Sequence, residues 1–149
     1  MKRLHVSIGV EDLDTNLAFY TTLFGTPPTK QKPDYAQWML DDPRVNFVLD
    51  GRVKDRGVGH LGIQVDSADE LTEIADRLEA ADRSVFSQKD AACCYARSDK
   101  AWSRDPQGVP WESFFTFGQE ATYGTDVTLT VPAETRKADS SASCCVAEG

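Results

Sequence analysis

Apolar and polar residues alternate in two stretches of the chain that share one pattern. HVSIGVED covers residues 5–12, HLGIQVDS covers residues 60–67, and the two align without a gap, 55 residues apart. In each stretch a histidine precedes three apolar residues at every second position, a period that places them on one face of a β-strand. The sequence therefore predicts an internal repeat whose two copies both begin with a strand.

A helix is predicted after each of these strands. Residues 13–24 carry apolar side chains at spacings of four, three and four, and Gly25 follows as a stop signal. Residues 71–78 carry a second apolar stripe, and Ser67 with Glu70 forms the S-x-x-E pattern of a capping box. Both segments therefore have the pattern of a helix that packs one face against a sheet.

Short strand-like runs follow each helix. They cover roughly 28–32, 35–40 and 45–49 in the first copy, and roughly 84–88, 93–98 and 110–117 in the second. The order of elements is thus βαβββ twice, and neither copy alone can bury both faces of so small a sheet. We therefore predict an α+β fold in which repeat 1 (about 1–50) and repeat 2 (about 59–117) pair into one half-open β-barrel or cleft.

Composition and charge narrow the partners. The net charge of −8 argues against nucleic acid and anionic membranes, which need a basic surface, and no apolar run approaches the length of a spanning helix. The N-terminal stretch is interpreted as a strand rather than a signal peptide. Residues 118–149 turn to Ala, Thr, Ser and Glu and are predicted to form a flexible tail behind the domain of residues 1–117. We expect a cytoplasmic monomer or homodimer that acts on a small molecule.

The four cysteines form two adjacent pairs, Cys93–Cys94 and Cys144–Cys145. A disulfide between neighbours is strained and staples no distant segments, so reduced thiols in the cytoplasm are the simpler interpretation. The pairs then serve soft-metal binding, metalloid binding or redox sensing, or they are small residues without a role. Cys144 and Cys145 lie in the predicted tail, either as accessory thiols or as an idle pair.

His5 and His60 are the two histidines of the chain, and they occupy equivalent positions of the repeats. If the copies pair through their first strands, the two imidazoles face each other across the cleft. A shared metal ion explains this register better than two separate strand histidines. We therefore expect both histidines to be ligands of one metal.

Glu112 is the candidate third ligand, within DPQGVPWESFF. A glutamate among apolar neighbours is costly to bury unless it is paired or bound to a cation, and the alternative is an edge-strand carboxylate that faces solvent. Phe47 aligns near Glu112 in the first repeat, so the site has one carboxylate and not two. Two histidines and one carboxylate are the facial triad of non-haem Fe(II) enzymes that use O2, although Zn(II) accepts the same ligands.

The double repeat with His5, His60 and Glu112 resembles the vicinal oxygen chelate superfamily of glyoxalase I, bleomycin and fosfomycin resistance proteins and extradiol dioxygenases. DPQGVPWE resembles the closing motif of that superfamily. KPDYA (32–36), GHLGIQV (59–65) and CCYARSDKAW (93–102) are similar to one branch, the ArsI-type carbon–arsenic lyases and their cadmium-induced relatives. The resemblance covers residues 1 to about 124.

The resemblance implies Fe(II)- and O2-dependent cleavage of the C–As bond of trivalent organoarsenicals such as methylarsenite, with arsenite as the product, and hence arsenic detoxification. The first-strand histidine is often missing from the cadmium-induced relatives, so its presence here as His5 favours the lyase.

Cys93 and Cys94 suit that substrate. Trivalent arsenic is thiophilic and three-coordinate, so two thiolates complete a monomethyl arsenical, whereas arsenite prefers three. Neighbours in a regular strand point to opposite faces, so we predict that the pair lies in a loop or at an irregular strand start, and that this loop moves. Tyr95, Lys100 and Trp102 are possible pocket residues, with Lys100 also near enough in sequence to lower the pKa of a thiol.

Three alternatives stay open. A protein of the same fold that sequesters Cd(II) or organoarsenicals without turnover needs the cysteines but not the triad. An extradiol dioxygenase or a glyoxalase-like isomerase needs no vicinal thiols, and glyoxalase-type sites usually add a fourth protein ligand. A protein that sequesters a drug needs no metal triad.

Overall fold

The chain folds as the predicted double repeat. The structure is a computed structural model that describes residues 1–125. The elements of the first repeat are β1 (Arg3–Gly9), α1 (Leu13–Phe24), β2 (Lys30–Lys32), β3 (Tyr35–Asp41) and β4 (Arg44–Asp50). Those of the second are β5 (Gly57–Val65), α2 (Ala68–Glu79), β6 (Phe86–Cys93), β7 (Ala96–Arg104) and β8 (Pro110–Gln119). The order βαβββ, repeated once, is confirmed.

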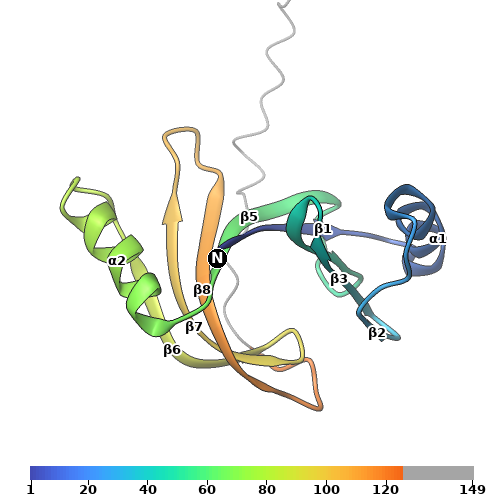
Figure 1. Ribbon diagram of the computed structural model, residues 1–149. Helices are drawn as coiled ribbons and strands as arrows, with labels where there is room; N and C mark the ends of the chain where they lie inside the picture. The colour runs from blue at the N-terminus through green and yellow to red at the C-terminus, as the bar shows by residue number, and fades with distance from the viewer. Residues whose placement is uncertain (126–149) are drawn as a thin grey trace, which may run out of the picture.

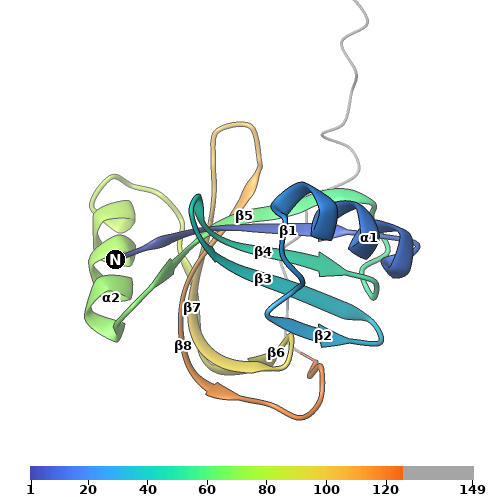
Figure 2. The same cartoon turned by 45° about the vertical axis from the view of Figure 1, so that its right-hand side comes forward.

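One curled sheet contains the strands of both repeats. Its order is β2-β3-β4-β1-β5-β8-β7-β6, so the two first strands are neighbours at the centre and run antiparallel. Figure 1 shows α1 and α2 at opposite ends of the molecule, each beside the half of the sheet that belongs to its own repeat. Figure 2 shows β7 and β8 curving beneath the strands of the first repeat, which leaves the sheet open along one side. The predicted half-open barrel is confirmed.

Local signals mark the end of α1 and the start of α2 where the sequence predicts. Gly25 adopts a left-handed conformation with φ of 68° directly after α1, a conformation that favours glycine. Ser67 precedes α2 and accepts a hydrogen bond from the backbone N–H of Glu70 at 3.2 Å. The Glu70 carboxylate accepts in turn from the backbone N–H of Asp66 at 2.9 Å. The reciprocal bond therefore reaches one residue further back than the usual capping box.

Alternation along the strands separates a core face from a cavity face. Ala36 and Trp38 of β3 are fully buried in a core cluster against α1, whereas Tyr35, Gln37 and Met39 line a cavity on the other face. The outer face therefore carries the core beneath the helices, and the inner face of the curled sheet is free to carry a site.

Two boundaries differ from those expected. The strand predicted over 93–98 is divided, because Cys94 and Tyr95 form a turn between β6 and β7. β8 runs to Gln119, past the expected end of the domain at residue 117, and Gly124 forms a β-bridge with Cys93. Cys144 and Cys145 lie outside the described residues. No helix within residues 1–125 has the length and apolar character needed to cross a bilayer.

Candidate metal centre and thiol pair

Three adjacent strands bring His5, His60 and Glu112 together. His5 lies on β1, His60 on β5 and Glu112 on β8, and Gly62 is the register partner of both His5 and Glu112. A Cβ atom on Gly62 would lie 2.3 Å from the carbonyl oxygen of Glu112 and 3.2 Å from Cδ2 of His5. The bare backbone at Gly62 therefore permits the close approach of two of the three side chains.

The three side chains form a tight, buried cluster. The Nε2 atoms of His5 and His60 are 3.1 Å apart, and Oε2 of Glu112 lies 3.3 Å from Nε2 of His60 and 3.6 Å from Nε2 of His5. Two nitrogens bonded to one metal ion at about 2.1 Å and at right angles lie about 3 Å apart, which matches the histidine pair. No other set of three potential metal ligands gathers in this way within residues 1–125.

The protonation of His5 suits a metal ligand. Its Nδ1 lies 3.0 Å from the backbone carbonyl of Asn46. A carbonyl oxygen only accepts, so Nδ1 carries the proton and Nε2 directs its lone pair at the cluster. Burial lowers the pKa of His5 from 6.5 to about 4, against the opposing effect of Glu112, so the ring is neutral at neutral pH.

The two oxygen atoms of the Glu112 carboxylate face different partners. Nζ of Lys100 lies 3.0 Å from Oε1, while Oε2 faces the two histidines. Burial alone raises the pKa of Glu112, but Lys100 and then His60 outweigh it and hold that pKa below its ordinary value. Burial also disfavours the charged Lys100, yet Glu112 and the two thiols outweigh it and raise the pKa of the lysine. Both groups therefore stay charged, and one carboxylate oxygen is left for a cation.

The position in repeat 1 that corresponds to Glu112 is Val48, not Phe47. Ser7 and Gly62 are equivalent in the two repeats, and their register partners are Val48 and Glu112. Phe47 points to the opposite face, where its ring packs 4.6 Å from that of Tyr20. The position in repeat 1 that is equivalent to Glu112 therefore carries an apolar side chain, Val48.

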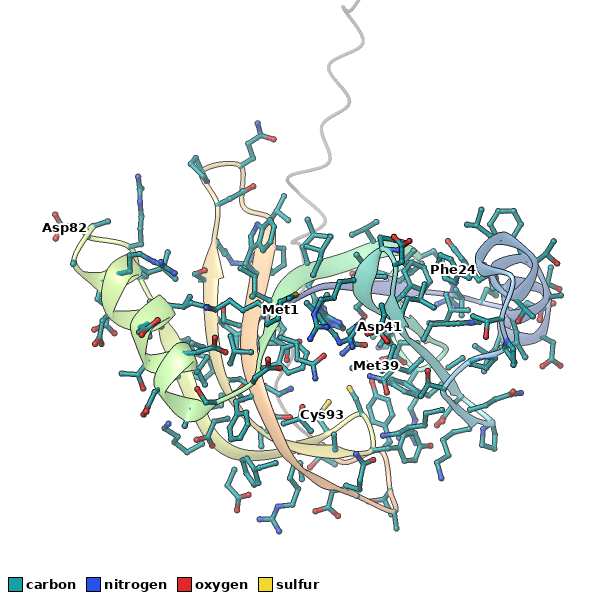
Figure 3. The ribbon with its side chains drawn as sticks, in the orientation of Figure 1. Met1, Phe24, Met39, Asp41, Asp82 and Cys93 are labelled. Carbon is teal, nitrogen blue, oxygen red and sulfur yellow. The ribbon has the colours of Figure 1, made fainter. Side chains whose placement is uncertain are left out.

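Cys93 and Cys94 face the same cavity. Cys93 ends β6, and Cys94 and Tyr95 form a two-residue turn with φ of 59° and 61°, the geometry of a tight hairpin. Their sulfur atoms lie 2.8 Å apart, and neither is in a disulfide. In Figure 3 the Cys93 side chain lies on the inner side of the β6–β7 hairpin, facing the space between the two halves of the sheet. The predicted irregular strand end is confirmed, and it allows neighbouring thiols to share one face.

The pKa of Cys94 is raised, although Lys100 is near enough in sequence to lower it. The hydrogen bond with Cys93 and then burial raise the pKa of Cys94, and Lys100 opposes this shift without reversing it. In the metal-free protein the Cys94 thiol is therefore protonated at neutral pH.

The turn is held by segments that sequence reasoning missed. The backbone N–H of Cys94 donates to the carbonyl of Tyr123 at 2.6 Å, and the Tyr95 hydroxyl donates to the Asp34 carboxylate at 2.6 Å. A Cβ atom on Gly124 would lie 1.9 Å from the carbonyl oxygen of Ala92. Residues 120–125 therefore support the thiols, although no motif in that stretch signals it.

One cavity of about 260 Å³ joins the thiols to the metal-ligand cluster, with Lys100 in its wall. Tyr95 and Trp102 do not line it, contrary to expectation. The Tyr95 ring packs behind the turn, 5.7 Å from Tyr35. The Trp102 ring lies 5.2 Å from His60, and its Nε1 donates to Gln88. The additional wall residues come mainly from the cavity faces of the first repeat and include Tyr35, Gln37, Asn46 and Gln64.

Comparison with known proteins places this fold and site in a class. Residues 2–113 match the model of the Glyoxalase/Bleomycin resistance protein/Dioxygenase superfamily. The structure resembles homoprotocatechuate 2,3-dioxygenase from Brevibacterium fuscum in its anaerobic substrate complex, with a TM-score of 0.59 and 18% identity over 81% of this chain and 38% of that one. The chain therefore belongs to this superfamily.

Two relatives in sequence indicate the branch of the superfamily to which the chain belongs. A trivalent organoarsenical cleaving enzyme from Bacillus sp. (strain MD1) is 45% identical over 121 residues, which cover 78% of this chain and 74% of the relative. A cadmium-induced protein from Mycobacterium bovis is 31% identical over 149 residues, covering 97% of this chain and 93% of the relative. The chain belongs to the branch that contains both, as its motifs indicate.

Proposed function

We propose that this protein cleaves the carbon–arsenic bond of trivalent organoarsenicals such as methylarsenite and releases arsenite, in an Fe(II)- and O2-dependent reaction that detoxifies arsenic. The observation that carries the proposal is that one cavity has both the buried His5–His60–Glu112 cluster and the Cys93–Cys94 pair in its walls. The activity named for the 45% identical relative supports the same conclusion.

The metal ligands are His5, His60 and Glu112. Iron(II) held by two imidazoles and one carboxylate supplies the O2-dependent oxidation of the carbon group that accompanies loss of arsenic. Lys100 keeps the carboxylate oriented, because it binds the oxygen that does not face the histidines. His5 is fixed in one tautomer by Asn46, so its lone pair needs no reorganisation before a cation binds.

Cys93 and Cys94 bind the arsenic. Two thiolates and the organic carbon complete three-coordinate arsenic, whereas arsenite lacks the carbon and is held less well by two thiols. The turn geometry brings both sulfur atoms to one side, which chelation by neighbours requires. The reaction needs a reducing compartment such as the cytoplasm, because a disulfide would remove both ligands. One chain supplies the whole site, so a monomer is sufficient and a homodimer would carry two copies.

Arsenic speciation tests the proposal. Fe(II)-loaded, reduced protein incubated with methylarsenite in air is expected to form arsenite. Formation should stop with His60→Ala, with Cys94→Ser and without O2. Lys89→Met is the matched control, because Lys89 forms an exposed ion pair with Asp99 outside the cavity. Methylarsenite that is bound and returned unchanged under Fe(II) and O2 would overturn the lyase.

A second candidate is sequestration of cadmium or organoarsenicals without turnover, which the similarity to the cadmium-induced protein favours. The two candidates differ in what they need from the triad. Sequestration should survive His60→Ala and fail in Cys94→Ser, whereas cleavage should fail in both. Methylarsenite binding by isothermal calorimetry and arsenite formation, both measured on the wild type and the two variants, separate them: binding without arsenite formation in the wild type indicates sequestration, and arsenite formation that is lost in His60→Ala while binding is retained indicates cleavage.

A further inference from the structure

Tyr35 is a buried tyrosine that lines the same cavity as the two thiols. The Tyr35 side chain is 3% exposed and lies on the cavity face of β3. It forms a cluster with Val48 and Tyr95, and Cys94 packs against that cluster. Tyr35 belongs to KPDYA, a motif to which neither the metal site nor the thiol pair gives a role. The structure therefore places a phenol from the first repeat and a thiol from the second in the wall of one cavity.

The hydroxyl of Tyr35 has no hydrogen-bond partner among residues 1–125. The two neighbouring tyrosines differ, since Tyr95 donates to Asp34 and Tyr123 donates to Asp50. Burial and then Cys94 raise the pKa of Tyr35 well above its ordinary value, so its phenol is protonated at neutral pH. Buried hydroxyls in proteins are normally satisfied, so an unused donor in a cavity wall indicates a group on a bound molecule.

Loading of a trivalent arsenical creates a need for such a donor. In water, methylarsenite carries two hydroxyl groups on arsenic, and each must leave as a thiolate binds. In each exchange one As–O bond breaks, one As–S bond forms, and the thiol proton ends on the departing oxygen as water. No electrons are transferred. Hydroxide is a poor leaving group, because water is a very weak acid, so a proton delivered as the bond breaks lowers the barrier.

We propose that Tyr35 is the acid that loads the arsenical: its hydroxyl proton passes to the departing arsenic-bound oxygen while the Cys94 thiol proton replaces it. This role rests on the proposed binding of trivalent arsenicals by Cys93 and Cys94. It assigns Tyr35 to substrate capture and not to cleavage of the carbon–arsenic bond. Acid assistance also depends on the leaving group, because a thiol leaves as a much more stable anion than hydroxide and gains little from it.

That dependence gives the test. Full-length Fe(II)-loaded protein is mixed without O2 with methylarsenite, or with the same arsenical carrying two 2-mercaptoethanol ligands, and protein-bound arsenic is followed over time by quenched flow and mass spectrometry. Tyr35→Phe is expected to slow capture of methylarsenite by about tenfold or more and capture of the thiol complex less than about twofold. Tyr95→Phe is the matched control, since it removes a hydroxyl already bonded to Asp34 and should change both rates by the same factor.

Equal slowing of the two forms by Tyr35→Phe, or no slowing of either, overturns the proposal. Solvent isotope effects on the wild-type protein test it without a variant. Capture in D2O should be slowed for methylarsenite and not for the thiol complex, and equal effects again overturn it. These capture rates are measured without turnover. Absence of arsenite formation in air would therefore overturn the lyase, whereas the role of Tyr35 in capture would still be decided by the capture rates.

Discussion

Lys100 and Glu112 form a buried ion pair, with Nζ 3.0 Å from Oε1 and both side chains less than a tenth exposed. The pair is the electrostatic link between the two parts of the cavity, because Glu112 faces the histidines while the thiols contribute to the raised pKa of Lys100. A buried pair stabilises little compared with an apolar pair, but removing one member leaves an uncompensated charge. A cation at the histidines would provide the alternative compensation for Glu112.

Lys100→Met is therefore expected to destabilise the metal-free protein by about 3–5 kcal/mol, since it leaves the Glu112 carboxylate buried without its cation. Urea unfolding in the presence of a chelator measures this loss. Lys89→Met is the control, because the Lys89 side chain is 71% exposed, and breaking its pair with Asp99 should cost less than about 1 kcal/mol. Equal losses in the two variants would contradict the burial argument.

Metal binding should recover part of that stability. A divalent ion at His5, His60 and Glu112 replaces the lost positive charge, so saturating Co(II) is expected to raise the Tm of Lys100→Met more than that of the wild type. Thermal scans with and without Co(II) provide the comparison. An equal increase in both proteins would show that Lys100 and the metal do not share Glu112.

Gly62→Ala is expected to weaken metal binding at least about tenfold, because its Cβ atom would lie 2.3 Å from the Glu112 carbonyl and displace β8 from β5. Gly59→Ala is a matched control on the same strand. A Cβ atom on Gly59 meets only the Ser7 carbonyl, at an ordinary 3.7 Å, so metal affinity should change by less than about twofold. Co(II) titration by calorimetry distinguishes the two, and equal affinities would contradict the close-approach argument.

Gly124→Ala should damage the thiol site and spare the metal site. Gly124 has a φ of 83°, and a Cβ atom there would lie 1.9 Å from the Ala92 carbonyl, so residues 120–125 must shift away from the thiol turn. We expect methylarsenite affinity to fall and Co(II) affinity to be retained, both measured by calorimetry. Gly118→Ala is the control, because its Cβ atom would lie 3.3 Å from the nearest atom, Cβ of Arg97, which requires a much smaller shift than the contact at Gly124. Parallel loss of both ligands in Gly124→Ala would show that the segment supports the whole fold.

The sequence predicts those features that depend on local pattern. The repeat, the two helices and the meeting of His5 with His60 follow from periodicity and from the pairing of equivalent strands. The place of Val48 does not, because the register of β4 against β1 is set by pairing that no local pattern encodes, and an error of one residue moves a side chain to the other face. The role of β3 in the cavity wall, including Tyr35, depends in the same way on how the sheet curls.

Strand propensity does not predict the turn within the strand expected over 93–98, for a related reason. Cys94 and Tyr95 adopt positive φ values without glycine or asparagine, which are the usual signals of such a turn. The requirement that two neighbouring thiols face one arsenic predicted irregular backbone there, whereas propensity alone predicted a strand. At this position the chemistry of arsenic binding predicts the backbone conformation better than residue propensity does.

The buried, neutral state of His5 predicts how stability depends on pH. Its pKa is about 4 in the folded protein and ordinarily 6.5, so the unfolded chain takes up a proton that the fold excludes. The contribution of neutral His5 is therefore complete above pH 6.5, falls as the pH is lowered from 6.5 toward 4, and totals about 3 kcal/mol. Urea unfolding of the metal-free protein across this range should show that slope.

His5→Gln should reduce the slope between pH 6.5 and 4.5, because glutamine does not titrate. Below pH 4.5 Glu112 adds a second loss, since its folded pKa is depressed and its protonation removes the pair with Lys100. The upper window therefore isolates the histidine from the carboxylate. A slope that persists unchanged in His5→Gln above pH 4.5 would show that His5 accepts its proton without cost. Protons would then compete with a metal for Nε2 of His5 close to neutral pH.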